Sequence, residues 1–241
     1  LHNAFDDVLV ARLTEGFRAL GGDASVRAVV LSGEGKSFCA GADLSWMRRM
    51  VSYGPEENRR DASGLAAMFL AVDSCPKPVV GRVQGAALGG GAGLVAVCDV
   101  AVAAEGTLLG TTEVRLGIVP GVISPFVVRK VGESHARRWF LTGERFDAAE
   151  ALRAGLVHSV VPEGELDAEV DRVLDALLLG GPEALAVSKG LAQRMGRVPL
   201  GEALMEATGV IAARRASAEG QEGMRAFLER RRASWTGGRG S

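Results

Sequence analysis

The chain has 241 residues, of which 47% are hydrophobic and 24% charged, and its formal net charge is −1. This length and composition predict a soluble globular protein with one substantial core, organised as a single domain with a helical appendage. The balanced charge gives no overall attraction to nucleic acid or to an anionic membrane, although the C-terminal end is locally basic. Charge alone therefore names no partner.

The three cysteines, Cys39, Cys75 and Cys98, lie in or beside apolar stretches without the paired spacing of a zinc site or a disulfide framework. This pattern is typical of a reduced intracellular protein, and we expect a cytoplasmic location. No apolar run has the length needed to cross a bilayer. The chain begins at Leu1 rather than Met, which leaves open a leader or a first strand before it.

Up to about residue 123, helical and strand-like patterns alternate along the chain. Such alternation requires crossover connections and predicts mostly parallel strand pairing. The expected elements are a helix over residues 8–20, a strand over 26–31, helices over 45–53 and 58–73, a strand over 79–83, a helical piece over 94–97, a strand over 99–103, and a segment over 109–116 that leads into GIVPG at 117–121.

Beyond about residue 124 the strand signals become sparse and helical periodicity dominates. The architecture is therefore a strand-rich core followed by a helical C-terminal third. The expected elements are helices over residues 125–141, 148–154, 165–179, 182–195 and 200–215, with one strand-like run over 156–161.

Two glycine-flanked loops, FCAGADL at residues 38–44 and GAALGGGAGL at residues 85–94, carry the strongest chemical signal. Each follows an apolar run typical of a strand and precedes a helix-like stretch, so each can aim bare backbone N–H groups at a shared point. Two such donors could hold a developing oxyanion.

Each loop also has another interpretation. The glycines of the second loop are compatible with close helix–strand packing. Residues 91–96 also fit the dinucleotide fingerprint G-x-G-x-x-A, with Glu113 about 20 residues onward, which would indicate a dinucleotide-dependent oxidoreductase. That match leaves the first loop unexplained and lies after two strand–helix units rather than at the first. In the first loop, Asp43 could simply cap the helix that begins near Ser45.

Together with Glu113 and residues 117–121, the two loops resemble the enoyl-CoA hydratase/isomerase (crotonase) superfamily. The resemblance covers nearly the whole chain, from HNAF at residues 2–5 to EGMRAFLERR at residues 222–231. Within the superfamily, the chain is most similar to bacterial methylglutaconyl-CoA hydratases and the related isohexenylglutaconyl-CoA hydratases. The segments that carry this finer similarity are WMRRM at 46–50, EVRLG at 113–117 and VISPFVV at 122–128.

The resemblance implies an α/β crotonase (ClpP-like) fold, in which stacked sheets of ββα-type turns precede a helical C-terminal region that mediates trimerisation. It implies a core domain over residues 1–190 and a C-terminal helical region over residues 191–241. It also implies a homotrimer, or a hexamer formed as a dimer of trimers. No metal or redox cofactor is expected, because coenzyme A is part of the acyl-CoA substrate.

The catalytic roles carry over position by position. The resemblance implies that the N–H groups of Ala42 and Gly90 bind the thioester oxygen. Of the superfamily's two catalytic glutamates, one maps to Glu113 and the other to Gly93, so only Glu113 is present. A carboxylate used by some isomerase and dehalogenase relatives maps to Gly121 and is also absent.

Glu113 can carry the proton chemistry of hydration on physical grounds. Hydrating an α,β-unsaturated thioester needs a base for water and an acid for the α carbon, and one carboxyl group can do both if its two oxygens face the same side of the double bond. An apolar setting such as Ile118 and Val119 would raise its pKa toward neutrality. The alternative is a solvated surface acid.

Further residues are candidates for binding the substrate. The resemblance implies that Ala40, Asp43 and Leu44 line the path of adenine and pantetheine. A second carboxylate on the acyl group would need a cation or several donors, and Arg115 and Ser124 are near in sequence.

Two of these candidates have competing interpretations. If residues 113–116 are extended, Arg115 shares the face of Glu113, although a salt bridge at a subunit interface is the alternative. Trp46 follows the first loop directly and could face the acyl pocket or pack in the core.

The basic C-terminal end is the last candidate region. In the superfamily this helix covers the coenzyme A site, often of a neighbouring subunit, and we expect Arg230 or Arg232 to approach its phosphates. A solvated helix face is the alternative, and RNA contact, as in some relatives, has little support from the balanced charge. His135 and His158 lack a nucleophile or metal-ligand pattern and are expected to be structural.

These features lead to one preferred reaction and one close rival. The preferred reaction is the reversible syn hydration of a glutaconyl-type acyl-CoA, linking 3-methylglutaconyl-CoA and 3-hydroxy-3-methylglutaryl-CoA in leucine and isovalerate metabolism. The rival is a Δ3,Δ2-enoyl-CoA isomerase, because moving one proton between two carbons needs only one carboxyl group. An oxidoreductase and an RNA-binding protein are the alternatives from other classes.

Overall fold

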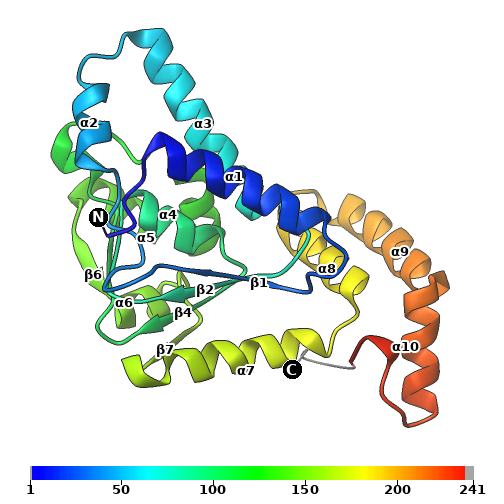
Figure 1. Cartoon of the computed structure of the whole chain (residues 1–241). Coiled ribbons are helices and arrows are strands. Elements are labelled where there is room, and N and C mark those ends of the chain that lie inside the picture. The colour runs from blue at the N-terminus through cyan, green and yellow to red at the C-terminus, as the bar shows by residue number, and fades with distance from the viewer. Residues whose placement is uncertain (1, 237–241) are drawn as a thin grey trace.

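A computed structural model describes residues 2–236 of the chain (Figure 1), and no helix in that range is long and apolar enough to cross a membrane. A parallel four-stranded sheet has the order β1 (Val29–Ser32), β2 (Val79–Val83), β4 (Val100–Ala104) and β7 (Ser159–Val161). A smaller sheet has the order β3 (Ala86–Leu88), β5 (Leu108–Gly110) and β6 (Arg145–Asp147).

The two sheets are linked by successive strands of the chain. β2 is followed by β3 and the buried helix α4 (Gly90–Val97), and β4 is followed by β5 and the 3₁₀ turn η1 (Glu113–Leu116). These are the ββα-type turns that the resemblance implied. Pairing is parallel throughout, as expected from the alternation, except that β6 runs antiparallel to β5.

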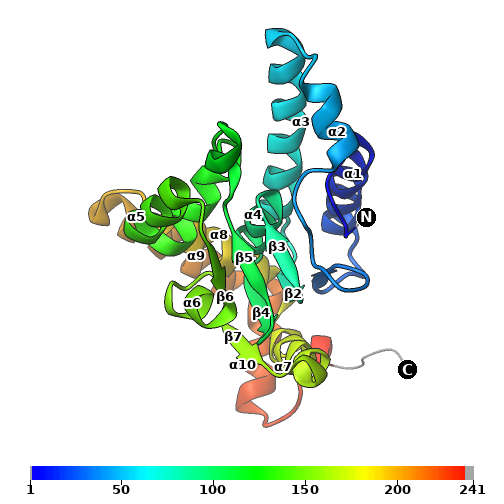
Figure 2. The ribbon, with the colours of Figure 1, turned by 90° about the vertical axis from the view of Figure 1, so that its left-hand side faces the viewer.

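Helices cover both sides of the strands (Figure 2). α1 (Asp7–Gly22), α2 (Leu44–Met50) and α3 (Pro55–Asp73) lie on one side, and α5 (Ser124–Thr142) and α6 (Ala148–Arg153) on the other. α7 (Leu166–Leu178) packs Leu166 and Val170 against β2 and β4, where Val80 and Val102 complete a small apolar cluster. α7 thus buries one apolar stripe, as its sequence periodicity predicts.

α8 (Pro182–Met195), α9 (Leu200–Ala216) and α10 (Ala218–Leu228) follow, and the last two extend away from the core (Figure 1). The carboxylate of Glu219 on α10 accepts the N–H groups of Glu183 and Ala184 in the first turn of α8. This contact holds α10 against α8 and satisfies two otherwise free helix donors. The boundary expected between residues 190 and 191 falls inside α8.

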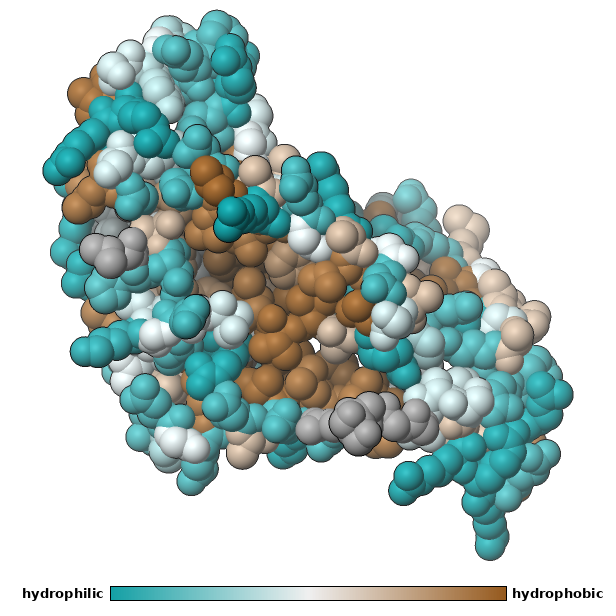
Figure 3. Space-filling view, viewed as in Figure 1, coloured by the Kyte–Doolittle hydropathy of each residue, from teal (hydrophilic) through white to brown (hydrophobic). Residues whose placement is uncertain are grey.

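The surface in Figure 3 shows apolar side chains gathered in the hollow between α1 and α7, over the main sheet. β1 is the edge strand there, and its Val30 is 40% exposed. Apolar groups are therefore not confined to the interior of the described chain.

Some local details differ from the sequence analysis. Residues 113–116 form a 3₁₀ turn, so the condition under which Arg115 would share the face of Glu113 is not met, and α4 begins at Gly90 rather than Leu94. β3 and β6 were not predicted. Both are three residues long and owe their pairing to partners distant in sequence, so neither has a local pattern that would reveal it.

Candidate active site

The two glycine loops lie side by side because their backbones pair. Cys39 donates its N–H to the Ala86 carbonyl at 2.9 Å and accepts the Leu88 N–H at 3.0 Å, which forms a parallel bridge between Cys39 and Ala87. The first loop is thus attached through Cys39 to β3, which forms part of the second loop.

This close approach explains a glycine inside α4. A Cβ placed on Gly91 would lie 2.3 Å from the carbonyl oxygen of Cys39, a backbone atom that a side-chain rotation cannot move away. Gly91 therefore permits the contact between the two loops.

Ala42 presents a free N–H group on the solvent side of the first loop. Phe5 donates its N–H to the Gly41 carbonyl at 2.7 Å and accepts the Asp43 N–H at 2.8 Å. Because successive N–H groups of an extended segment point to opposite sides, the N–H of Ala42 points away from Phe5. Ala42 is exposed, and no acceptor within residues 2–236 pairs with this group.

The second donor is the N–H of Gly90. Gly90 is the first residue of α4, so its N–H has no partner within the helix, and the helix dipole favours negative charge there. The preceding residue, Gly89, turns the chain into the helix with φ of 54°, a conformation that favours glycine. The predicted pair of donors is thus available as two free N–H groups on adjoining backbone segments.

Glu113 lies at the same place. The N–H of Gly89 donates to the Gly110 carbonyl at 2.8 Å, which fixes the end of β5 against the glycine loop three residues before Glu113. The carboxyl oxygen Oε1 of Glu113 lies 3.3 Å from the position that a Cβ on Gly89 would occupy. The carboxyl group is therefore next to the residue that precedes the Gly90 donor.

The environment of this carboxyl group favours its protonated form. Oε2 is buried and has no hydrogen-bond partner among the described residues. Burial raises the pKa of Glu113, and the only opposing contribution is a hydrogen bond to its own backbone. A base with a raised pKa holds a proton more readily at neutral pH, as acid/base catalysis of hydration requires.

The raised pKa predicts a stability effect. The folded state binds more protons than the unfolded state at pH values between 4.5, the ordinary pKa, and the raised pKa, so stability from Glu113 is full below 4.5 and is lost as pH rises through the folded pKa. Glu113→Gln, which is uncharged, should therefore unfold at a higher temperature than the parent at neutral pH. Thermal unfolding across pH should show the difference shrinking toward pH 4.5; a lower unfolding temperature for the variant at neutral pH would contradict the assignment.

Asp43 and Ser124 both have local partners. The carboxylate of Asp43 caps α2 by accepting the N–H groups of Ser45 and Trp46, and these bonds lower its pKa. The hydroxyl of Ser124, at the start of α5, donates to the Gly121 carbonyl at 2.8 Å. The capping interpretation of Asp43 is confirmed, and its carbonyl accepts the Met47 N–H at 2.8 Å. Ala40 and Leu44 are exposed on the first loop.

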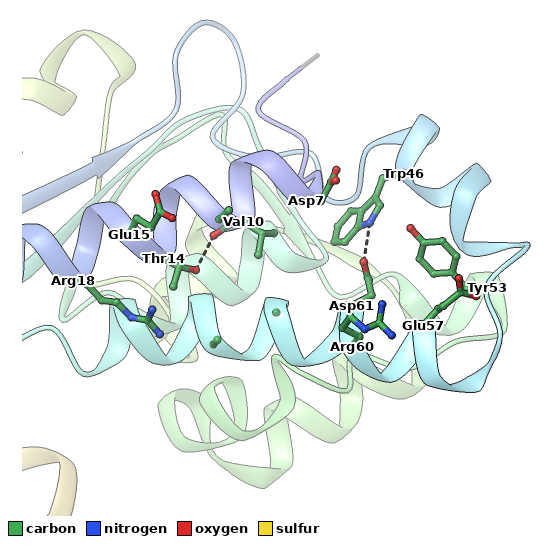
Figure 4. Close-up of a pocket in the computed structure, with 13 residues that line it drawn as sticks. Asp7, Val10, Thr14, Glu15, Arg18, Trp46, Tyr53, Glu57, Arg60 and Asp61 are labelled. Carbon is green, nitrogen blue, oxygen red and sulfur yellow. Dashed lines mark hydrogen bonds between the residues drawn. The ribbon is translucent and has the colours of Figure 1, made fainter.

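Trp46 is buried and lines a cavity away from the Glu113 carboxyl group. It is 3% exposed, and its indole N–H donates to Asp61 on α3 at 3.0 Å (Figure 4). It lines a cavity of about 520 Å³ between α1, α2 and α3, whose described lining includes neither Glu113 nor the Ala42 and Gly90 donors. The structure thus does not bring Trp46 to the site that these groups form.

The expected face shared by Arg115 and Glu113 is not formed. In a 3₁₀ turn, residues two apart point in different directions, unlike in a strand. The Arg115 side chain lies beside Gly143 at the end of α5, with Nε 3.2 Å from the position of a Gly143 Cβ.

Arg230 and Arg232 are exposed and follow α10 in the sequence. In both views α10 lies away from α4, the helix that begins at Gly90 (Figures 1 and 2). A single chain therefore does not place them at the Glu113 site.

The histidines and cysteines have structural surroundings. His158 accepts the N–H of Ala101 at Nδ1, and burial lowers its pKa, so it is neutral. His135 packs against Trp139 with 5.9 Å between ring centroids. Burial raises the pKa of Cys39 to about 11 and of Cys98 to about 12, which leaves both thiols protonated and unreactive.

The dinucleotide interpretation does not fit the geometry. A dinucleotide loop needs its glycines at the turn between strand and helix, where phosphates reach the backbone. Here Gly91 and Gly93 lie inside α4 and are buried against Cys39 and Ile123. The fingerprint match is therefore accidental.

The sequence did not reveal two contacts at the site, one made by Glu113 and one made by Gly93 of α4. Gly89 lies against its carboxyl group, and Ile123 fills the space next to Gly93. The glycine triplet signals a close approach, but nothing local in sequence states which group approaches.

Comparison with known proteins identifies the family of this chain. Residues 1–238 match the family described as enoyl-CoA hydratase/isomerase. A Thermus thermophilus protein that carries the name enoyl-CoA hydratase is 37% identical to this chain, over 95% of this chain and 90% of its own length. The crotonyl-CoA hydratase of Syntrophomonas wolfei is 32% identical over 97% and 89%.

Solved structures agree with the fold. An enoyl-CoA hydratase from Shewanella pealeana superposes with a TM-score of 0.93 at 39% identity, over 97% of this chain and 88% of that one. Pseudomonas aeruginosa AtuE superposes with a TM-score of 0.94 at 38% identity, over 98% and 92%. The chain has the crotonase fold and belongs to the enoyl-CoA hydratase/isomerase family, as an enzyme of the enoyl-CoA hydratase type, a hydro-lyase.

Proposed function

We propose that this enzyme catalyses the reversible syn hydration of a glutaconyl-type acyl-CoA, interconverting 3-methylglutaconyl-CoA and 3-hydroxy-3-methylglutaryl-CoA. The observation that carries the proposal is the carboxyl group of Glu113 lying against Gly89, directly before the free N–H of Gly90. An acid/base group and an oxyanion donor are thereby next to each other.

In the proposed reaction, the thioester oxygen accepts the N–H groups of Ala42 and Gly90. The Glu113 carboxylate removes a proton from water as the water oxygen bonds to the β carbon, and negative charge moves onto the thioester oxygen. The same carboxyl group then gives the proton to the α carbon and returns to its charged form. Each oxyanion donor contributes roughly 3–4 kcal/mol to the barrier reduction. This cycle uses no metal or redox cofactor.

The glutaconyl specificity rests on the sequence segments that resemble methylglutaconyl-CoA hydratases. The distal carboxylate of such a substrate needs a cation or hydroxyl donors. Ser124, at the start of α5, remains our candidate among the predicted residues, together with Arg115 after a side-chain rearrangement away from Gly143. Ala40, Asp43 and Leu44 would line the coenzyme A path through the exposed side of the first loop.

The experiment offers the enzyme 3-hydroxy-3-methylglutaryl-CoA and a 3-enoyl-CoA in parallel. Dehydration of the first compound supports the proposal. Turnover of the 3-enoyl-CoA alone would contradict it and support the isomerase, a rival that the single carboxylate favours.

We propose a homotrimer, or a hexamer of two trimers, assembled through α9 and α10. Both helices extend from the core and expose large apolar side chains, among them Met205 at 73% and Phe227 at 83% exposure. A neighbouring subunit would cover them and could bring its Arg230 and Arg232 to the coenzyme A phosphates.

This assembly predicts that charge on the apolar arm dissociates it. Met205→Glu or Phe227→Glu should lower the mass measured by light scattering from that of a trimer or hexamer toward that of one chain. Glu202→Gln, on the exposed first turn of α9, is the control and should leave the mass unchanged. A monomeric parent would contradict the proposal.

A further inference from the structure

Gly89, which precedes α4, and Gly93, inside α4, are neighbouring positions on the backbone. Gly89 and Gly93 are one helical turn apart, and the N–H of Gly93 donates to the Gly89 carbonyl at 3.2 Å. The group that faces Gly93 therefore lies one helical turn from Gly89, the residue against which the Glu113 carboxyl group lies. Ile123 precedes α5, which packs against both α4 and η1, the turn that carries Glu113.

Ile123 occupies the second position. Its Cγ2 lies 2.4 Å from the place where a Cβ on Gly93 would be, and its Cβ lies 3.0 Å from that place. Phe69, on α3, closes the same space with Cε1 at 3.0 Å. Gly93 is buried and Ile123 is 3% exposed, so these hydrocarbon groups leave no room for another side chain.

The position of Ile123 is fixed by its backbone. Its carbonyl accepts the N–H groups of Phe126 at 3.1 Å and Val127 at 3.0 Å, in the first turn of α5. Phe69 in turn contacts the ring of Phe126, with 5.9 Å between centroids. The apolar group that faces Gly93 is thus held by two helices rather than by a mobile loop.

We propose that Ile123 is a specificity-determining residue that sets the ratio of hydration to isomerisation; the inference rests on the proposed role of Glu113. Hydration needs a bound water as well as a carboxyl group, whereas isomerisation only moves a proton from C2 to C4 of a 3-enoyl thioester. Because the Ile123 side chain is hydrocarbon, it offers the bound water no hydrogen bond, and Glu113 is the hydrogen-bond partner that remains on this face of α4. Ile123 thereby lowers hydration relative to isomerisation.

The test compares two substitutions that differ by one hydroxyl group. Ile123→Thr and Ile123→Val both shorten the side chain by one methyl and keep the branch at Cβ, but only threonine can bind water. The readout is the ratio of initial rates for dehydration of a 3-hydroxyacyl-CoA and isomerisation of the 3-enoyl-CoA of the same chain length. We expect the ratio to be about fivefold higher for Ile123→Thr than for Ile123→Val, the factor that one neutral hydrogen bond supplies. Equal ratios in the two variants would overturn the proposal.

A second measurement tests the packing directly. Gly93→Ala should lower the unfolding temperature because its Cβ meets Ile123, and adding Ile123→Ala should make the effect of Gly93→Ala smaller. If Gly93→Ala is as stable as the parent, Ile123 does not fill this space and the proposal fails. If the parent enzyme converts neither substrate, the proposed function is refuted. If the parent is active but Ile123→Thr and Ile123→Val give equal ratios of the two rates, only the role of Ile123 is refuted.

Discussion

Glu113→Gln should lower kcat by about a hundredfold or more, while coenzyme A thioesters still bind. Glutamine keeps the size and hydrogen-bonding shape of the side chain but cannot accept the proton from water or return it to the α carbon. The N–H groups of Ala42 and Gly90 are unaffected by the change, so the thioester oxygen keeps its donors. Steady-state kinetics and calorimetric titration with a substrate analogue measure the two quantities separately.

Glu105→Gln is the matched control for this prediction. Glu105 is an exposed residue just after β4, and its described hydrogen bond is made by its backbone N–H to the Val161 carbonyl. Its substitution should leave kcat within about twofold of the parent, as surface changes usually do. Equal kcat in Glu113→Gln and the parent would remove Glu113 from the mechanism.

Gly91→Ala should reduce both activity and stability. The new Cβ would lie 2.3 Å from the Cys39 carbonyl oxygen, so the first loop must move away from α4. Overpacking of this kind costs about 1–3 kcal/mol of stability. Displacing an oxyanion donor costs about a hundredfold in kcat. Kinetics and thermal unfolding of the same preparation measure both effects.

Gly16→Ala separates this effect from a general response to glycine substitution. Gly16 lies inside α1, and a Cβ there would meet nothing within 4 Å. Alanine should therefore stabilise α1 by about 0.5–1 kcal/mol and leave kcat unchanged. An active and stable Gly91→Ala enzyme would show that the two loops do not depend on their close contact.

The sequence predicted the long elements well because their signals are local. The pattern over residues 182–195 matches α8 residue for residue, and the helix expected over residues 58–73 lies within α3. Apolar periodicity and prolines at helix starts are sufficient in such segments. The conformation of η1 was left open, because four residues with two apolar side chains fit a strand as readily as a helix.

The candidate site was predictable in its members but not in its arrangement. The two loops pointed to backbone donors, and the resemblance to the crotonase superfamily selected Ala42, Gly90 and Glu113; the structure places these loops together and Glu113 beside Gly89. Arg115 and Trp46 were chosen by closeness in sequence, and the 3₁₀ turn and the bond to Asp61 direct them elsewhere. Ile123 and Gly93 meet through contacts between α4 and the start of α5, which no local pattern encodes.

The bridge between Cys39 and Ala87 holds together two loops whose proposed role depends on backbone atoms alone. The proposed oxyanion donors are backbone N–H groups, so a point mutation cannot delete them and can only displace them by altering the loops. The proposed proton-transfer group is a side chain, which a single codon change removes or replaces. An ancestral enzyme with these paired loops could therefore change its acidic side chains and the apolar side chains next to them, and with them the reaction it catalyses. Its descendants would still bind the thioester carbonyl through the same backbone N–H groups.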